Sequence, residues 1–299
     1  MFKKAERQAA PLKIAITGPS FSIKTYSMLM LARGICGPDG RIAVVDTENS
    51  SASLYADVTD FDVVNIRPPF TAVKYIEAIN AAIDGGYDVL CIDSLSHEWS
   101  SVGGVLAYKD ELDLIKDMWG NWGIAKKDHN ILLYEVILQA PIDTIVTMRS
   151  KMKYELQSEN GKMAPKKIGL EPIQQPEIEY EFGIVLTGDA HTHEASVSKD
   201  RTRLWEGRPS FKVTEKDGET LARWRDEGGA FVLDIQPETR KRVNKLIKAL
   251  GWTKENWMQN SIGILEEIEA VGITTTADLT EEQGVAYADA LAKLNKGDK

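Results

Sequence analysis

Short apolar runs alternate with longer amphipathic segments through the first half of the chain. The runs are rich in β-branched residues and apolar on both faces, which is typical of strands buried in a parallel sheet. The segments between them have helical spacing and end at glycine or proline. Strands are predicted over residues 13–17, 41–46, 61–66, 88–93 and 143–148, and helices over 25–35, 73–83 and 131–139. This alternation predicts an α/β fold, with a mainly parallel sheet covered by helices on both faces.

The pattern changes twice in the second half. From Glu177 to Trp205 it becomes strand-like, with charged turns, as expected for further strands. Beyond Pro237, three short amphipathic helices are predicted, over residues 239–250, 261–270 and 281–294. We therefore expect two domains, a core of residues 1–235 and a small helical C-terminal module of residues 236–299. The module is expected to bind a protein partner.

Composition narrows the class of protein. With 43% hydrophobic residues in 299, the chain can bury a sizeable core. Its net charge of −9 argues against a protein that coats nucleic acid, so any such contact requires a local basic patch. The two cysteines lack metal-binding spacing, and no apolar stretch approaches membrane-spanning length. These features predict a cytoplasmic protein that does not enter a membrane.

A candidate phosphate-binding loop, GPSFSIKT, joins the first strand to the first helix. It matches the pattern GxxxxGK[ST] at Gly18, Lys24 and Thr25. In such loops backbone N–H groups cradle phosphates, the lysine reaches the β and γ phosphates, and the hydroxyl binds Mg²⁺. The loop therefore predicts binding of ATP and Mg²⁺. The residues expected to contact the nucleotide are Gly18, Pro19, Ser20, Lys24, Thr25 and Tyr26.

One position departs from the pattern. Ile23 replaces the second glycine, and Phe21 stands where a small residue is common. A β-branched residue resists unusual backbone angles, at a cost of about 1–3 kcal/mol. Three readings stay open: an ATPase, a fold that binds nucleotide with little or no hydrolysis, and a partner-binding protein without a working nucleotide site.

Acidic residues follow two of the predicted strands. Asp93 closes the run DVLCID, where a carboxylate can hold Mg²⁺ together with Thr25 or merely cap the next helix. Asp46 and Glu48 follow the second strand, and a carboxylate there can act as general base toward the attacking water. The position relative to the other motifs favours Glu48. Lys24, Glu48 and Asp93 are the predicted catalytic residues of this subunit.

The order of these motifs over residues 13–148 resembles the RecA family of ATPases. The stretches VVDTENSSASLYAD, YDVLCIDSLSHEW and TMRSKMKYEL are similar, more closely, to a family of phage-encoded RecA-like P-loop ATPases. That family is associated with homologous recombination and single-strand annealing. The resemblance implies a homo-oligomer, either a ring or a filament, that acts on single-stranded DNA.

The resemblance also implies a DNA-facing loop after the fifth strand. The loop combines lysine and arginine with one aromatic ring that could stack on a base, which suits single strands. A solvated basic loop, or a loop at the neighbour's ATP, is the alternative. The expected DNA-binding residues are Arg149, Lys151, Lys153, Tyr154, Lys166 and Lys167.

A further expectation concerns the segment SKDRT. It resembles the Lys-x-Arg element that RecA-like rings place against the nucleotide of the next subunit, so Lys199 is a candidate nucleotide contact and Arg201 a candidate catalytic residue. Alternation along a strand would put both side chains on one face. The alternative is an exposed basic turn.

Overall fold

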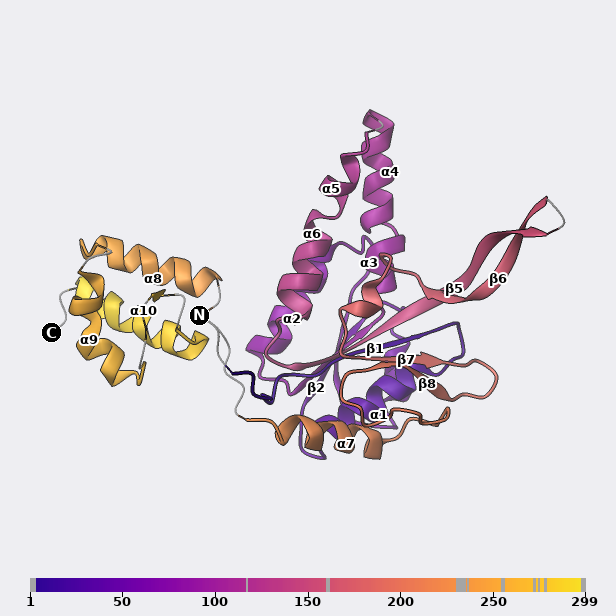
Figure 1. Cartoon of the computed structure of the whole chain (residues 1–299), viewed down its shortest axis with the longest axis horizontal. Helices are drawn as coiled ribbons and strands as arrows, with labels where there is room; N and C mark the ends of the chain where they lie inside the picture. The colour runs from indigo at the N-terminus through magenta and orange to yellow at the C-terminus, as the bar shows by residue number, and fades with distance from the viewer. Residues whose placement is uncertain are drawn as a thin grey trace. The chain divides into compact units, whose positions relative to one another are not determined.

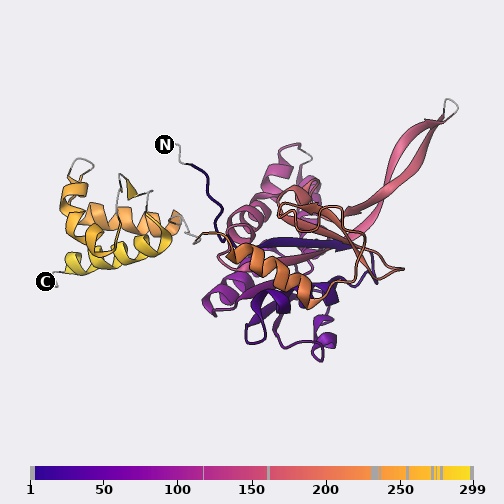
Figure 2. The same ribbon diagram turned by 60° about the horizontal axis from the view of Figure 1, so that its bottom comes forward.

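The computed structural model describes residues 4–116, 118–159, 162–229, 235, 237–253, 256–270, 273, 275–276 and 279–296. The chain divides into two compact units, residues 9–227 and the remainder (Figures 1 and 2). The strands β1–β8 belong to the first unit, and the three C-terminal helices belong to the second. The domain boundary expected between residues 235 and 236 falls at a residue that lies outside the described part of the chain.

The first unit is built on an eight-stranded sheet with the path β3-β2-β4-β5-β1-β7-β8, in which β6 pairs with β5. The pairs along the path are parallel except for β7 with β8, and β6 is also antiparallel to its partner. Every residue of β2 and β4 is buried, as the apolar runs predicted. The strands are β1 (Lys13–Gly18), β2 (Ile42–Asp46), β3 (Asp62–Asn65), β4 (Val89–Asp93), β5 (Asp143–Glu159), β6 (Lys162–Pro172), β7 (Ile184–Gly188) and β8 (Ala195–Asp200).

Helices cover both faces of this sheet, which confirms the predicted fold class. On one face α1 (Lys24–Cys36) and α7 (Glu215–Asp226) enclose an apolar cluster. On the other face α2 (Ala72–Asp84) and a π-helix, Ile131–Ile137, enclose a second cluster. Helices α1 and α7 lie side by side along the sheet (Figure 1).

The region between β4 and the π-helix was not predicted as helical. It forms four short helices, α3 (Ser96–Ser100), α4 (Val105–Ile115), α5 (Asn121–Ala125) and α6 (Lys127–Asn130). They build an arm that rises from the sheet, with α4 beside α5 and α6 (Figure 1). Its own small apolar cluster contains Trp99, Val105 and Ala125. Glycines interrupt the helical spacing of the apolar residues in this region, and the sequence prediction depended on that spacing.

The prediction of a loop after residue 148 is wrong. Strand β5 continues to Glu159 and pairs with β6 as a long antiparallel hairpin that leaves the body of the unit (Figures 1 and 2). The charged composition of this segment hid its strand character. A two-stranded ribbon away from a core can expose both faces to water, so it tolerates lysines at positions where a buried strand would not.

The second unit consists mainly of α8 (Pro237–Ala249), α9 (Trp257–Glu267) and α10 (Glu281–Lys296), which confirms the three predicted helices. They pack around a small core of their own that includes Val243, Leu265 and Tyr287. Among the described residues of the whole chain, no helix combines the length and the apolarity that crossing a membrane requires.

A partly buried lysine gives the first unit a pH-dependent stability. Lys13 Nζ donates to the backbone oxygens of Ala140 and Ile142, at 2.8 and 2.9 Å, and to Thr144 Oγ1 at 3.1 Å. Burial lowers the pKa of Lys13 to about 7, against the opposing charge of Asp143. The unfolded chain therefore binds more protons than the folded chain above pH 7, and stability must rise with pH in that window.

We expect the free energy of unfolding to increase by about 2 kcal/mol between pH 7 and pH 9 on account of Lys13 alone. Denaturant titrations at several pH values measure this slope. The Lys13→Met variant, which has no group to titrate there, should show a flatter profile. An identical slope in the two proteins would exclude the lysine as its source.

Candidate functional site

The loop between β1 and α1 lies at the carboxyl edge of the sheet. At Gly18 the backbone has φ of +155°, and a Cβ atom there would meet Ser22 Oγ at 2.3 Å and the carbonyl oxygen of Gly188 at 2.9 Å. Ser22 is buried and donates its hydroxyl hydrogen to the carbonyl oxygen of Pro19 at 2.8 Å. Only glycine fits at position 18, because the loop turns back on itself against β7.

Two residues of this loop have backbone conformations that normally favour glycine. Phe21 has φ of +64°, and Ile23, directly before α1, has φ of +51° and ψ of +28°. For a β-branched residue this left-handed conformation is an outlier that costs about 1–3 kcal/mol. Position 23 therefore has the backbone conformation expected of the usual glycine, although it carries the branched side chain of isoleucine.

Lys24 opens α1 and turns its amine back over the loop. Its Nζ donates to the carbonyl oxygen of Pro19 at 2.6 Å and approaches Ser22 Oγ at 3.4 Å. Burial lowers the pKa of Lys24, although the charges of Asp93 and Glu48 act in the opposite direction. A half-buried cation next to the free N–H groups of a helix N-terminus is a favourable environment for an anion.

Asp93, at the end of β4, is 2% exposed. Its two carboxylate oxygens accept hydrogen bonds from Thr25 Oγ1 and Thr147 Oγ1, both at 2.6 Å. Burial raises the pKa of Asp93, and the two hydroxyl donors partly offset this effect. The alternative role as a helix cap is not seen, because no side chain caps α3. Thr25 and Asp93 thus present adjacent oxygens, the ligands that Mg²⁺ prefers.

The two acids at the end of β2, Asp46 and Glu48, have different environments. Asp46 is buried and accepts hydrogen bonds from the backbone N–H groups of Glu48 at 2.7 Å and Ala52 at 2.8 Å, so it shapes the loop. Glu48 Oε1 accepts from Ser94 Oγ at 2.9 Å and from Arg149 Nε at 2.7 Å, while Arg149 Nη2 donates to Oε2. Burial alone would raise the pKa of Glu48, but Arg149, Ser94 and His97 together outweigh it, and the net pKa is lowered.

These side chains surround a cavity of about 600 Å³. Of the residues predicted from the sequence, Ser20, Lys24, Thr25, Glu48, Asp93 and Arg149 line it. Gly18, Pro19 and Tyr26 do not. Tyr26 instead packs against Tyr55 on the core side, with ring centroids 6.4 Å apart.

Other residues of the cavity were missed. Those that line it are Ser22, Ser51, Tyr55, Ser150 and Ile173, and Thr147 contacts Asp93 from outside the lining. The sequence carried a signal for Thr147, because it lies next to the end of a predicted strand at the same edge as Asp93. Ile173 could not be found in this way, since it follows β6, a strand that was expected to be a loop.

Lys199 and Arg201 do not line this cavity in their own chain. Lys199 Nζ donates to the carbonyl oxygens of Glu179 at 3.2 Å and Tyr180 at 2.6 Å, and Arg201 Nη2 approaches the same oxygen of Tyr180 at 3.4 Å. Both cations therefore approach the carbonyl oxygen of Tyr180, although Arg201 lies one residue beyond β8.

The basic residues of the hairpin fall into two groups. Arg149 stands at its base, where it binds Glu48, and Lys151 and Lys153 are exposed further along β5. Lys151 pairs with Glu171 at 3.4 Å. Tyr154, Lys166 and Lys167 belong by backbone to β5 and β6, but their side chains lie outside the described part of the structure.

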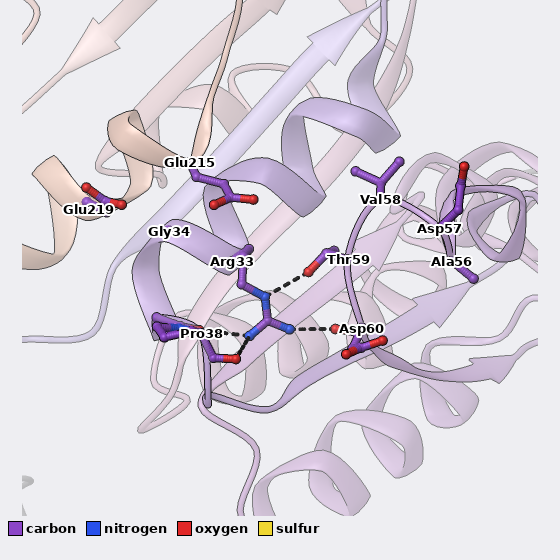
Figure 3. A pocket seen from close by; sticks show the side chains of 11 residues that line it. Arg33, Gly34, Pro38, Ala56, Asp57, Val58, Thr59, Asp60, Glu215 and Glu219 are labelled. Carbon is purple, nitrogen blue, oxygen red and sulfur yellow. Dashed lines mark hydrogen bonds between the residues drawn. The ribbon is translucent and has the colours of Figure 1, made fainter.

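A separate hollow, also of about 600 Å³, lies between α1, the segment 56–60 and α7 (Figure 3). Arg33 holds its rim together by donating to Thr59 Oγ1 at 2.7 Å and to the carbonyl oxygens of Gly40 at 2.8 Å and Asp60 at 2.7 Å. Four acidic side chains also line it, so the hollow disfavours a phosphate. They are Asp57, Asp60, Glu215 and Glu219.

The conformation of Ile23 leads to a prediction for the first site. Replacing Ile23 by glycine removes the left-handed strain, so we expect the free energy of unfolding to stay within about 1 kcal/mol of the parent despite the added chain entropy. Affinity for an ATP analogue should rise, because the β-branched side chain lines the cavity. Calorimetry and fluorescence titration measure the two effects. Ile23→Ala, which keeps a Cβ, is the matched control and should gain less.

Comparison with known proteins agrees with this geometry. No curated protein matches the chain. A family model described as an AAA domain matches residues 10–225, which include β1, the phosphate-loop motif, β4 with Asp93 and the whole hairpin. Since that match covers most of the chain, the protein belongs to the AAA domain family, a group of P-loop ATPase-like proteins.

Proposed function

We propose that this protein binds ATP with Mg²⁺ in the cavity lined by Lys24, Thr25 and Asp93, and that it uses the nucleotide to handle single-stranded DNA in phage recombination. One observation carries the proposal. The base of the basic hairpin, through Arg149 and Ser150, lines the same cavity as the phosphate loop. A ligand on the hairpin and a ligand in the cavity therefore share side chains.

The residues present fit ATP and Mg²⁺. Lys24 Nζ and the N-terminus of α1 offer positive charge to phosphate oxygens. The oxygens of Thr25 and Asp93, 2.6 Å apart, offer the hydroxyl and carboxylate that would hold Mg²⁺. When bound, Mg²⁺ neutralises charge that develops on the phosphate oxygens. The cavity of about 600 Å³ lies within the range of small-molecule sites.

Glu48 is the residue that would take a proton from the attacking water. Both its oxygens are engaged by Arg149, which together with Ser94 and His97 lowers its pKa. A carboxylate held in this way is a weak base. Hydrolysis therefore requires Arg149 to leave Glu48, and Arg149 lies on the strand that continues into the hairpin. DNA bound along the hairpin would compete for this guanidinium, which favours hydrolysis stimulated by DNA.

A homo-oligomer is part of the proposal. Lys199 and Arg201 stand apart from the cavity of their own chain, so they would act on the nucleotide of a neighbouring subunit. Two large apolar side chains near the cavity support a neighbour there, Phe21 at 83% and Leu54 at 80% exposure. Side chains of this kind are normally covered at an interface.

The test compares ATP turnover with and without a thymidine oligonucleotide. We expect the oligonucleotide to raise turnover by about tenfold or more, and Lys151→Ala with Lys153→Ala to remove most of that gain without changing turnover in its absence. The matched control is Lys212→Ala with Lys216→Ala, two exposed lysines away from the hairpin. Turnover indifferent to DNA in all three proteins would remove the link between hairpin and cavity.

One alternative has a specific observation behind it. Both Phe21 and Ile23 have left-handed backbone conformations, and the charge of Glu48 is paired with that of Arg149. These features also fit a scaffold that binds nucleotide without hydrolysing it. Saturable binding of ATP with no turnover, with or without DNA, would favour this second function.

A further inference from the structure

The C-terminal unit carries its charges unevenly. Helix α8 contains five cationic residues and one acidic residue, in a chain whose net charge is −9. Helix α9 has two acidic residues and no lysine or arginine. Of the three helices α8, α9 and α10, only α8 therefore has a net positive charge.

Most of the cations of α8 lie on its solvent face. Val243 is fully buried and Leu246, Ile247 and Leu250 pack around it, which fixes the side of the helix that meets the core. At 100° per residue, the opposite side carries Lys241, Lys245 and Lys248, while Arg240 and Arg242 flank the core-facing strip. All five are exposed: Arg240, Lys241, Arg242, Lys245 and Lys248.

Three of these cations have no carboxylate partner among the described contacts. Arg242 pairs with Asp289 at 2.6 Å, and Lys241 with Glu238 at 2.6 Å. The described ion pairs leave Arg240, Lys245 and Lys248 available, and Lys245 and Lys248 lie one helical turn apart. Like charges at this spacing repel one another, so the arrangement costs free energy unless an anion sits over it.

We propose that the exposed cationic surface of α8 is a sequence-independent binding site for the phosphate backbone of duplex DNA. Rows of lysine and arginine on one helix face are the footprint of a phosphate backbone. The described outward residues of α8 include no aromatic ring on which an unpaired base could stack, which separates this site from single-strand platforms. The site requires neither nucleotide nor the hairpin, so it goes beyond the function proposed above.

The experiment measures binding of the full-length, nucleotide-free protein to a labelled 20-base-pair duplex over a range of salt concentrations. Neutralising Arg240, Lys245 and Lys248 together to glutamine removes three phosphate contacts. The slope of log affinity against log salt should fall by about 2.7, and affinity at 0.1 M salt should drop by at least about tenfold. Binding of a thymidine oligonucleotide and ATP turnover, which depend on the first unit, should stay unchanged.

The matched control removes the same charge elsewhere, through Lys212→Gln, Lys216→Gln and Lys293→Gln, all exposed positions outside α8. It should behave like the parent. A gain-of-charge variant, Ala249→Lys on the exposed end of α8, should tighten duplex binding and needs no loss of folding to be informative. The proposal is overturned if the α8 variant binds the duplex as the control does, or if the parent does not bind the duplex at 50 mM salt. It is also overturned if these cations bind an acidic protein and not the duplex.

Discussion

Replacing Glu48 by glutamine should lower ATP turnover by about 10²–10⁴-fold, the usual contribution of a general base, while nucleotide affinity changes little. The amide keeps the shape of the side chain and can still accept a hydrogen bond from Ser94 Oγ, which lies 2.9 Å from Oε1. It cannot accept a proton from water. Phosphate release under saturating ATP measures the first effect, and titration with a fluorescent analogue measures the second.

Asp46→Asn is the matched control for this variant. Asp46 sits two residues away, but its oxygens hold the backbone N–H groups of Glu48 and Ala52. An amide can replace only one of those acceptors, so we expect a loss of about 1–3 kcal/mol in stability and a smaller loss of turnover. If Asp46→Asn were the variant that abolished turnover with folding intact, the assignment of the base to Glu48 would be wrong.

Asp93→Asn should have opposite effects on activity and on stability. Turnover should fall by about 10²-fold or more, because the carboxylate that would hold Mg²⁺ is gone. The nucleotide-free protein should become no less stable, since burial raises the pKa of Asp93 and so disfavours its charged form. Thermal unfolding without nucleotide and turnover with Mg²⁺ measure the two effects.

A second buried aspartate provides the contrast. Asp143 lies at the start of β5, at the opposite edge of the sheet, where it accepts the N–H of Leu12 and pairs with Arg225. Asp143→Asn removes that ion pair and should destabilise the fold by a few kcal/mol, as breaking a buried pair does. Turnover by the folded fraction should persist. A loss of turnover in Asp143→Asn equal to that in Asp93→Asn would mean that both act only through stability.

The sequence predicted the parts of the fold that depend on burial. Strands β1, β2 and β4 are apolar on both faces because helices cover both sides, and this pattern is visible in the residues themselves. The same reasoning located Asp93 and Glu48, because polar residues at the carboxyl ends of parallel strands meet at one edge.

The hairpin and the arm were missed for physical reasons. The hairpin has no core to impose alternation, and its pairing depends on backbone hydrogen bonds that any residue but proline can make. The arm keeps large apolar side chains in water, with Leu114 at 88% and Trp119 at 92% exposure, so its apolar residues do not mark a buried face. The contact between Arg149 and Glu48 joins residues 101 positions apart, which no local pattern can predict.

The cavity at the phosphate loop is expected to bind ATP through Lys24. Titration of the full-length protein with a fluorescent ATP analogue and Mg²⁺ tests it most directly, with Lys24→Ala and the exposed-site variant Lys216→Ala measured in parallel. Our account predicts saturable binding by the parent and by Lys216→Ala, weakened by about 100-fold or more in Lys24→Ala, since that variant loses a charge-assisted contact in a half-buried site. Equal affinity in all three proteins, or no binding by the parent and by Ile23→Gly alike, would contradict it.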